Sequence, residues 1–130
     1  MKYIGFIKEH NDIDEAISFE EIVNTRNESL EYDDRIIKYL NKGVTLLAWM
    51  GYFNDLQSRQ LIAPDSYLTD GVWVWPAYLP YYLKNYSGLK LSPEFLKYLA
   101  DNDYDLVLSD SFFELKEKYE KELSLKLGGW

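Results

Sequence analysis

The sequence predicts a single α+β domain over residues 1–130, in which four to five helices pack on a small, mostly antiparallel sheet. Three observations predict this class. Short apolar segments typical of strands are interspersed with segments of helical periodicity. An Asp-Gly pair lies between two strand-type runs, and Ser or Pro marks the start of several helices. With 47% apolar and 17% aromatic residues, the chain has enough material to bury a core.

The clearest local signal is a β-hairpin at about residues 66–75. Asp70 and Gly71 separate two strand-forming runs, and this pair is favoured in a type I′ turn, in which both central residues have positive φ. Trp73 and Trp75 alternate with two valines, so both faces of the second strand are apolar. We therefore expect both faces of this strand to be covered by other elements.

Two further strands are expected. Residues 2–8 are apolar and β-prone, and VTLLAWM over 44–50 is a continuous apolar run that predicts a buried strand ended by Gly51. Residues 52–65 are mixed and polar and predict a loop. Residues 104–108 fit either a strand or an extended link.

Five segments have the signals of helices. Ser18 and Glu21 fit a capping box, in which each side chain accepts a hydrogen bond from the other residue's backbone N–H. Gly43 follows the second segment, where a left-handed C-terminal cap belongs. Ser92 and Pro93 supply a cap and a first-turn proline for the fourth. The predicted helices cover about 19–25, 31–42, 79–86, 93–100 and 111–126.

The charge of the chain is concentrated in one region. The net charge is −8, but residues 9–34 alone carry ten acids and one base, and the rest of the chain sums to +1. Such a region repels nucleic acid and anionic membranes and attracts a basic protein partner. The alternative is a solvated face that only keeps the protein soluble. The candidate partner-binding residues are Asp12, Asp14, Glu15, Glu20, Glu21, Glu28, Glu31, Asp33 and Asp34.

No constellation of residues indicates catalysis, a cofactor or a metal. The chain has no Cys, and His10, expected at the surface, is its only histidine, so the usual triads and thiolate or multi-histidine metal sites lack their parts. Neither phosphate-binding glycine motif is present. We therefore expect a non-enzymatic protein without cofactors. MKYIGFIKEH is too polar for a signal peptide, and no apolar run is long enough to span a bilayer, which favours the cytoplasm.

The aromatic segment over 66–86 leaves an alternative open. Its rings, among them Trp73, Trp75, Tyr78 and Tyr82, are suited either to core packing or to a cleft for a small ligand or a hydrolysed substrate. A nucleic-acid stacking platform is excluded because residues 60–83 contain no Lys or Arg. A structural module that forms a homodimer through aromatic surface is a third reading.

Four motifs together resemble a family of small bacterial proteins of uncertain function. These are GVTLLAW at 43–49, LTDGVWVWP at 68–76, LPYYL at 79–83 and SPEFL at 92–96, and the pattern T-D-G-x-W-x-W-P is their most specific part. The resemblance covers roughly residues 36–99 and brings no catalytic residues. Small soluble proteins of this kind often resemble immunity proteins, which implies an inhibitor that neutralises a basic toxin domain through the acidic surface.

Overall fold

Four strands form a mixed sheet in the order β1-β4-β3-β2, in a computed structural model that describes residues 1–25 and 34–128. The edge pair β1 and β4 is parallel, and the other two pairs are antiparallel. The predicted α+β class, with its mostly antiparallel sheet, is confirmed. The strands are β1 (Lys2–Tyr3), β2 (Val44–Asn54), β3 (Leu61–Thr69) and β4 (Trp73–Pro76).

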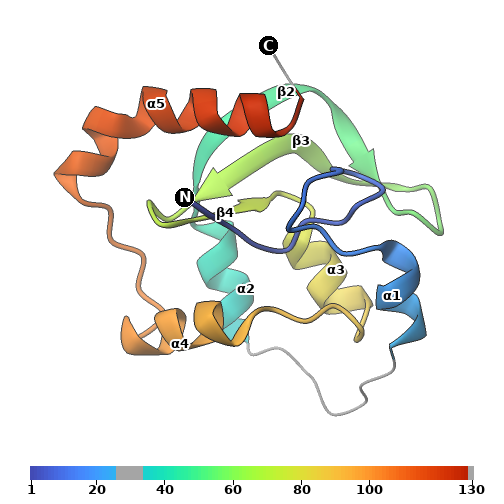
Figure 1. The fold of residues 1–130 in the computed structure, drawn as a ribbon. Coiled ribbons are helices and arrows are strands. Elements are labelled where there is room, and N and C mark those ends of the chain that lie inside the picture. The colour runs from blue at the N-terminus through green and yellow to red at the C-terminus, as the bar shows by residue number, and fades with distance from the viewer. Residues whose placement is uncertain (26–33, 129–130) are drawn as a thin grey trace.

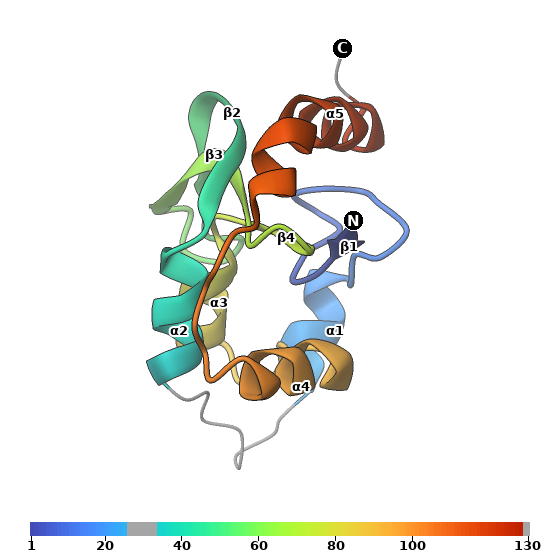
Figure 2. The same ribbon diagram turned by 90° about the vertical axis from the view of Figure 1, so that its left-hand side faces the viewer.

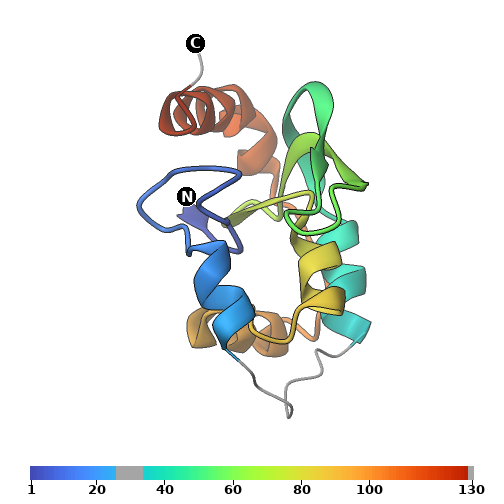
Figure 3. The ribbon, with the colours of Figure 1, turned by 90° about the vertical axis from the view of Figure 1, so that its right-hand side faces the viewer.

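Five helices in the described residues accompany the sheet, close to the predicted positions. They lie in two groups (Figures 1, 2 and 3): α1 to α4 lie together on one side of β4, and α5 lies alone on the other side, beside β2. The helices are α1 (Phe19–Asn24), α2 (Asp34–Asn41), α3 (Leu79–Asn85), α4 (Pro93–Asp101) and α5 (Asp110–Lys126).

The predicted hairpin is formed by β3 and β4, but its turn is not type I′. Only Gly71 has a positive φ, of 97°, and Asp70 does not. Instead the Asp70 carboxylate is buried, and its Oδ1 accepts hydrogen bonds from the backbone N–H groups of Val72 and Trp73, at 2.9 and 2.7 Å. The side chain of Asp70 therefore organises the turn, in the way that Asp and Asn do in many loops.

The run 44–50 is not the buried strand that its apolar sequence predicts. It belongs to β2, which lies at the edge of the sheet, continues through Gly51 to Asn54, and leaves most of its side chains exposed. A short apolar run does not by itself distinguish a central strand from an edge strand, which explains the error. Residues 61–65, predicted as loop, form the first half of its partner β3.

The predicted first strand is also shorter than 2–8. Only Lys2–Tyr3 joins the sheet, and the chain then leaves it at Gly5, whose φ is 75°. Ile7 forms one isolated bridge with Ile17. The N-terminal segment therefore returns on itself and leads into α1 as an irregular loop (Figure 3). Residues 104–108 form no strand and link α4 to α5.

The core between β4 and the helix group is aromatic. Trp75 is fully buried against Tyr39 of α2 and Phe95 of α4, and its indole N–H donates to the Leu40 carbonyl at 3.2 Å. Gly43 lies against the same ring: a Cβ there would meet Trp75 Cζ2 at 2.6 Å. Gly43 has no positive φ. This glycine therefore permits close approach of the chain to Trp75, rather than the left-handed cap that the sequence predicts.

Candidate functional site

The candidate partner-binding acids that the structure describes fall in two places. Asp12, Asp14 and Glu15 lie on the loop that precedes α1, Glu20 and Glu21 form the first turn of α1, and all five are exposed. Asp34 begins α2, which lies on a different side of the molecule from α1 (Figures 2 and 3). The remaining candidates, Glu28, Glu31 and Asp33, lie outside the described residues. We refer to Asp12, Asp14, Glu20 and Glu21 as the acidic face.

The start of α1 is fixed by two side chains. Ser18 Oγ accepts a hydrogen bond from the Glu21 N–H at 3.2 Å, which is the Ser18 half of the predicted capping box. The second side chain is that of Glu9, whose carboxylate accepts from the Phe19 N–H at 2.8 and 3.0 Å. Carboxylates in a first helical turn are stabilised by the helix dipole. Glu20 and Glu21 are therefore held at a defined helix end.

Glu15 differs from its neighbours because it has a partner. Its carboxylate pairs with Lys126 Nζ at 2.9 Å, and this hydrogen bond raises the pKa of Lys126. Lys126 also lies over the ring of Tyr3, 4.6 Å from its centre. Among the residues that the structure describes, the four carboxylates of the acidic face have no such ion pair. Their charge is therefore directed to solvent.

Side-chain hydrogen bonds, buried or partly buried, attach the loop to the rest of the fold. Asn11 donates to the Tyr67 hydroxyl at 2.7 Å and accepts from the Tyr78 hydroxyl at 2.9 Å. The Tyr78 hydroxyl in turn accepts from the backbone N–H of Ile7 at 2.8 Å. Asn11 thus joins the segment before Asp12 to β3 and α3, so the acidic face is presented on a supported loop.

His10 is not the surface residue expected from sequence. It is half-buried, with its ring 5.2 Å from that of Phe53 and 4.6 Å from that of Tyr78, and its Nε2 lies 2.8 Å from the Tyr82 hydroxyl. Burial lowers the pKa of His10, against the opposing effect of Glu9 and Asp55. A neutral imidazole that bonds a tyrosine and packs against aromatic rings is a structural group here.

The lowered pKa of His10 predicts a dependence of stability on pH. The folded state favours the neutral ring, so this penalty is absent above the ordinary pKa of about 6.5 and grows as the pH falls below it. We expect the urea concentration at the midpoint of unfolding to decrease as the pH is lowered from about 7.5 to about 5.5. His10→Gln should flatten this part of the profile. An unchanged slope in that variant would assign the titration to another group.

Asp55 is the most strongly bonded carboxylate in the described structure. It is 2% exposed and accepts hydrogen bonds from the hydroxyls of Tyr81, at 2.6 Å, and Tyr86, at 2.9 and 3.0 Å. The backbone N–H groups of Gln57 and Ser58 donate to its Oδ1. Burial alone would raise the pKa of Asp55, but these bonds together lower it to about 2. Asp55 therefore stays ionised and ties the β2–β3 loop to α3.

The rings considered as an alternative binding surface are core residues. Trp73, Trp75, Tyr78 and Tyr82 are 4%, 0%, 0% and 0% exposed. They pack against helices and the N-terminal segment, so they do not present an aromatic surface. One polar atom stands out: the indole N–H of Trp73 is buried and has no hydrogen-bond partner within the described part of the chain.

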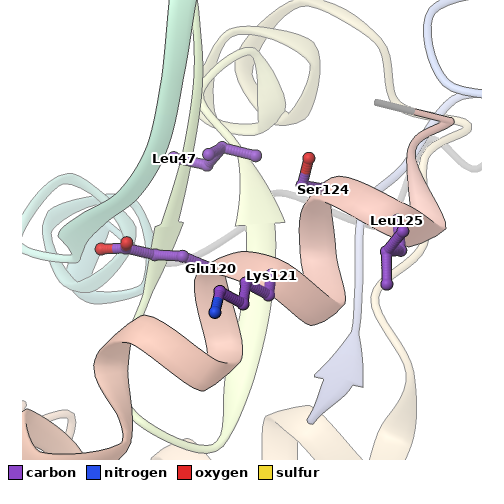
Figure 4. A pocket seen from close by; sticks show the side chains of 5 residues that line it. All are labelled: Leu47, Glu120, Lys121, Ser124 and Leu125. Carbon is purple, nitrogen blue, oxygen red and sulfur yellow. The ribbon is translucent and has the colours of Figure 1, made fainter. Parts of the chain in front are cut away.

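A hollow of about 440 Å³ lies between β2 and α5 (Figure 4). Its side chains are Leu47 from the strand and Glu120, Lys121, Ser124 and Leu125 from the helix. Glu120 is paired with Lys116 at 2.8 Å, and Lys121 is the other charged side chain that lines this space. Its walls suit apolar contact rather than chemistry. Within residues 1–25 and 34–128, no group of three or more His, Asp or Glu side chains is placed to hold a metal ion.

Sequence reasoning missed several exposed apolar residues of β2 and α5. Met50 is 99% exposed and Leu125 is 74% exposed, and Trp49 and Tyr52 are also exposed. The signal that was available is Gly51, because a glycine inside a strand pattern often marks a bulge. Three residues of β2, 49–51, lie opposite the single residue Asp65 of β3 at this point.

No family model, curated protein or solved structure matches this chain. Within the described ranges, no helix has the length and apolarity needed to cross a membrane.

Proposed function

We propose that this chain is a non-enzymatic bacterial binding protein, most concretely an immunity-type inhibitor that neutralises a basic toxin domain in the cytoplasm. The observation that carries the proposal is the acidic face. It combines four exposed carboxylates, which have no ion pair within the described part of the chain, on a loop and a helix end that side-chain hydrogen bonds hold in place. Surfaces of one sign steer a partner of opposite sign and set the rate of encounter.

The rigid attachment of the loop matters to this proposal as much as the charge. Asn11, bonded to Tyr67 and Tyr78, immediately precedes Asp12, and the Ser18 cap immediately precedes the turn with Glu20 and Glu21. A supported acidic surface binds without first having to order a chain, which preserves affinity. A merely solvated face has no need of this support.

The test is a titration against the basic, toxin-like product of the gene next to the one for this chain. In the variant D12N/D14N/E20Q/E21Q, we expect association at low salt to slow by about 10- to 100-fold and to lose most of its salt dependence. The control E114Q/E117Q/D103N/D105N removes the same charge at exposed positions elsewhere and should associate at nearly the original rate. Equal loss in both variants, or no binding by the original chain, would refute the proposal.

A further inference from the structure

The bulge in β2 displays apolar side chains that the fold does not use. Between the pairs Ala48–Ser66 and Tyr52–Pro64, the strand has three residues opposite one, and Gly51 adopts a φ of 109°. The excursion carries Met50 fully into solvent and leaves Trp49 exposed on 38% of its surface. Exposed apolar groups beside one another mark sites of contact in soluble proteins.

This edge also lacks the protection by charge that edge strands normally have. The sequence of β2, VTLLAWMGYFN, contains no charged residue, although 28% of the whole chain is charged. Edge strands usually carry Lys or other charges that prevent association. Leu125 of α5, 74% exposed, lines the hollow together with Leu47 of β2 (Figure 4). We refer to Leu47, Trp49, Met50 and Leu125 as the apolar patch.

Two series of contacts connect the apolar patch to the loop that carries Asp12, Asp14 and Glu15. From β2, the ring of Trp49 lies 5.7 Å from that of Tyr67, whose hydroxyl bonds Asn11 next to Asp12. From α5, Leu125 is followed by Lys126, which pairs with Glu15. The loop, the end of α5 and the β2–β3 hairpin therefore frame one face of the molecule (Figure 3). The loop that carries Asp12, Asp14 and Glu15 therefore lies on the same face of the molecule as the patch.

We infer that the apolar patch is the anchor site for the same basic partner that the acidic face attracts. The inference rests on the proposed function and adds the chemistry of the partner: a basic surface with an apolar centre. Trp and Met are enriched at the centres of interfaces, and a few such residues carry most of the binding energy. Charges at the rim control mainly the rate of association, and the anchors control dissociation.

A defined probe separates the two contributions. The probe is a synthetic amphipathic helical peptide of Leu and Lys, compared with a Ser and Lys peptide of equal charge. Binding is followed by Trp fluorescence in a Trp130→Phe background, where Trp49 is the exposed indole and Trp73 and Trp75 are buried. We expect a blue shift with the Leu–Lys peptide alone, since only that peptide offers apolar groups to cover Trp49.

The decisive variant removes two anchors that the fold does not need. M50S/L125S should weaken binding of the Leu–Lys peptide by about tenfold or more and speed its dissociation. The matched control V107S/F113S removes two other exposed apolar side chains, 78% and 59% exposed, and should bind like the original chain. Equal binding by all three proteins, or equal binding of the two peptides, would overturn the anchor site.

Two further outcomes distinguish this inference from its premise. If the variant D12N/D14N/E20Q/E21Q slows binding of the Leu–Lys peptide and M50S/L125S leaves it unchanged, the anchor site fails and the acidic face stands. If only M50S/L125S weakens binding, the apolar patch stands and the role of the acidic face fails. Light scattering gives the remaining result: a dimer that M50S/L125S dissociates would make a second copy the occupant and would overturn the inference.

Discussion

Asp55→Asn is expected to destabilise the protein by about 2 to 3 kcal/mol, because it removes a buried charge that holds four hydrogen bonds. The donors are the hydroxyls of Tyr81 and Tyr86 and the N–H groups of Gln57 and Ser58. The amide of Asn keeps one acceptor oxygen, but its NH₂ group faces hydroxyls that need an acceptor. Chemical denaturation at neutral pH measures the loss, and an unchanged free energy of unfolding would contradict this account of the network.

The same carboxylate predicts the acid limit of stability. Its pKa in the folded protein, about 2, lies below the ordinary value of 3.8, so the fold stabilises the ionised form. That contribution is fully present above about pH 4 and is lost as the pH falls toward 2, and it amounts to about 2 kcal/mol. Asp55→Asn should remove this part of the pH profile.

Tyr86→Phe provides the matched control for the network. Alone it should cost about 1 to 2 kcal/mol, since one hydroxyl donor to a carboxylate is lost. Combined with Asp55→Asn it should cost much less, because the two residues share the interaction. Strict additivity of the two changes would show that the hydroxyl and the carboxylate contribute independently.

Gly88→Ala is expected to cost about 3 kcal/mol, because its new methyl group meets backbone rather than a movable side chain. A Cβ on Gly88 would lie 1.8 Å from the carbonyl oxygen of Ile22 and 2.6 Å from that of Thr25, both at the end of α1. The chain after α3 thus packs directly against the C-terminal end of α1. The methyl group forces one of the two segments to move.

This displacement has its own measurement and control. Hydrogen exchange over residues 19–24 should accelerate in Gly88→Ala, and the free energy of unfolding should fall with it. The neighbouring Ser87 is exposed, and Ser87→Ala should change neither quantity by more than about 0.5 kcal/mol. Faster exchange confined to other helices would contradict the packing of α1 on Gly88.

Local chemistry accounts for the parts of the fold that the sequence predicts well. Ser92 caps α4 by accepting from the Phe95 N–H at 3.1 Å, with Pro93 as the first helical residue, as expected of that pair. The hairpin around Gly71 is likewise encoded by adjacent residues. The first half of β3, residues 61–65, was missed because Pro64 and Asp65 are typical of turns, and pairing with β2 holds them extended.

The candidate site likewise has features that could be predicted from the sequence and features that could not. Exposure of the acidic residues near α1 follows from their chemistry and could be predicted. The partners of Asp55 could not, because Tyr81 and Tyr86 lie 26 and 31 residues away in the chain. The same limit applies to Trp49, whose apolar side chain indicates burial until the sheet order places β2 at an edge.

The parallel pairing of β1 with β4 has a consequence for the order of folding. Lys2 pairs with Trp73 and Tyr3 with Val74, so this contact closes a long loop of the chain, in which the structure describes α1, α2, β2 and β3. Closing such a loop costs entropy that only later contacts repay. During synthesis on the ribosome, the N-terminal segment can form its contacts only after β4 and α3 have emerged. The acidic face is thus assembled late. A chain interrupted before Trp73 would carry the same carboxylates, but it would lack the contacts that place them.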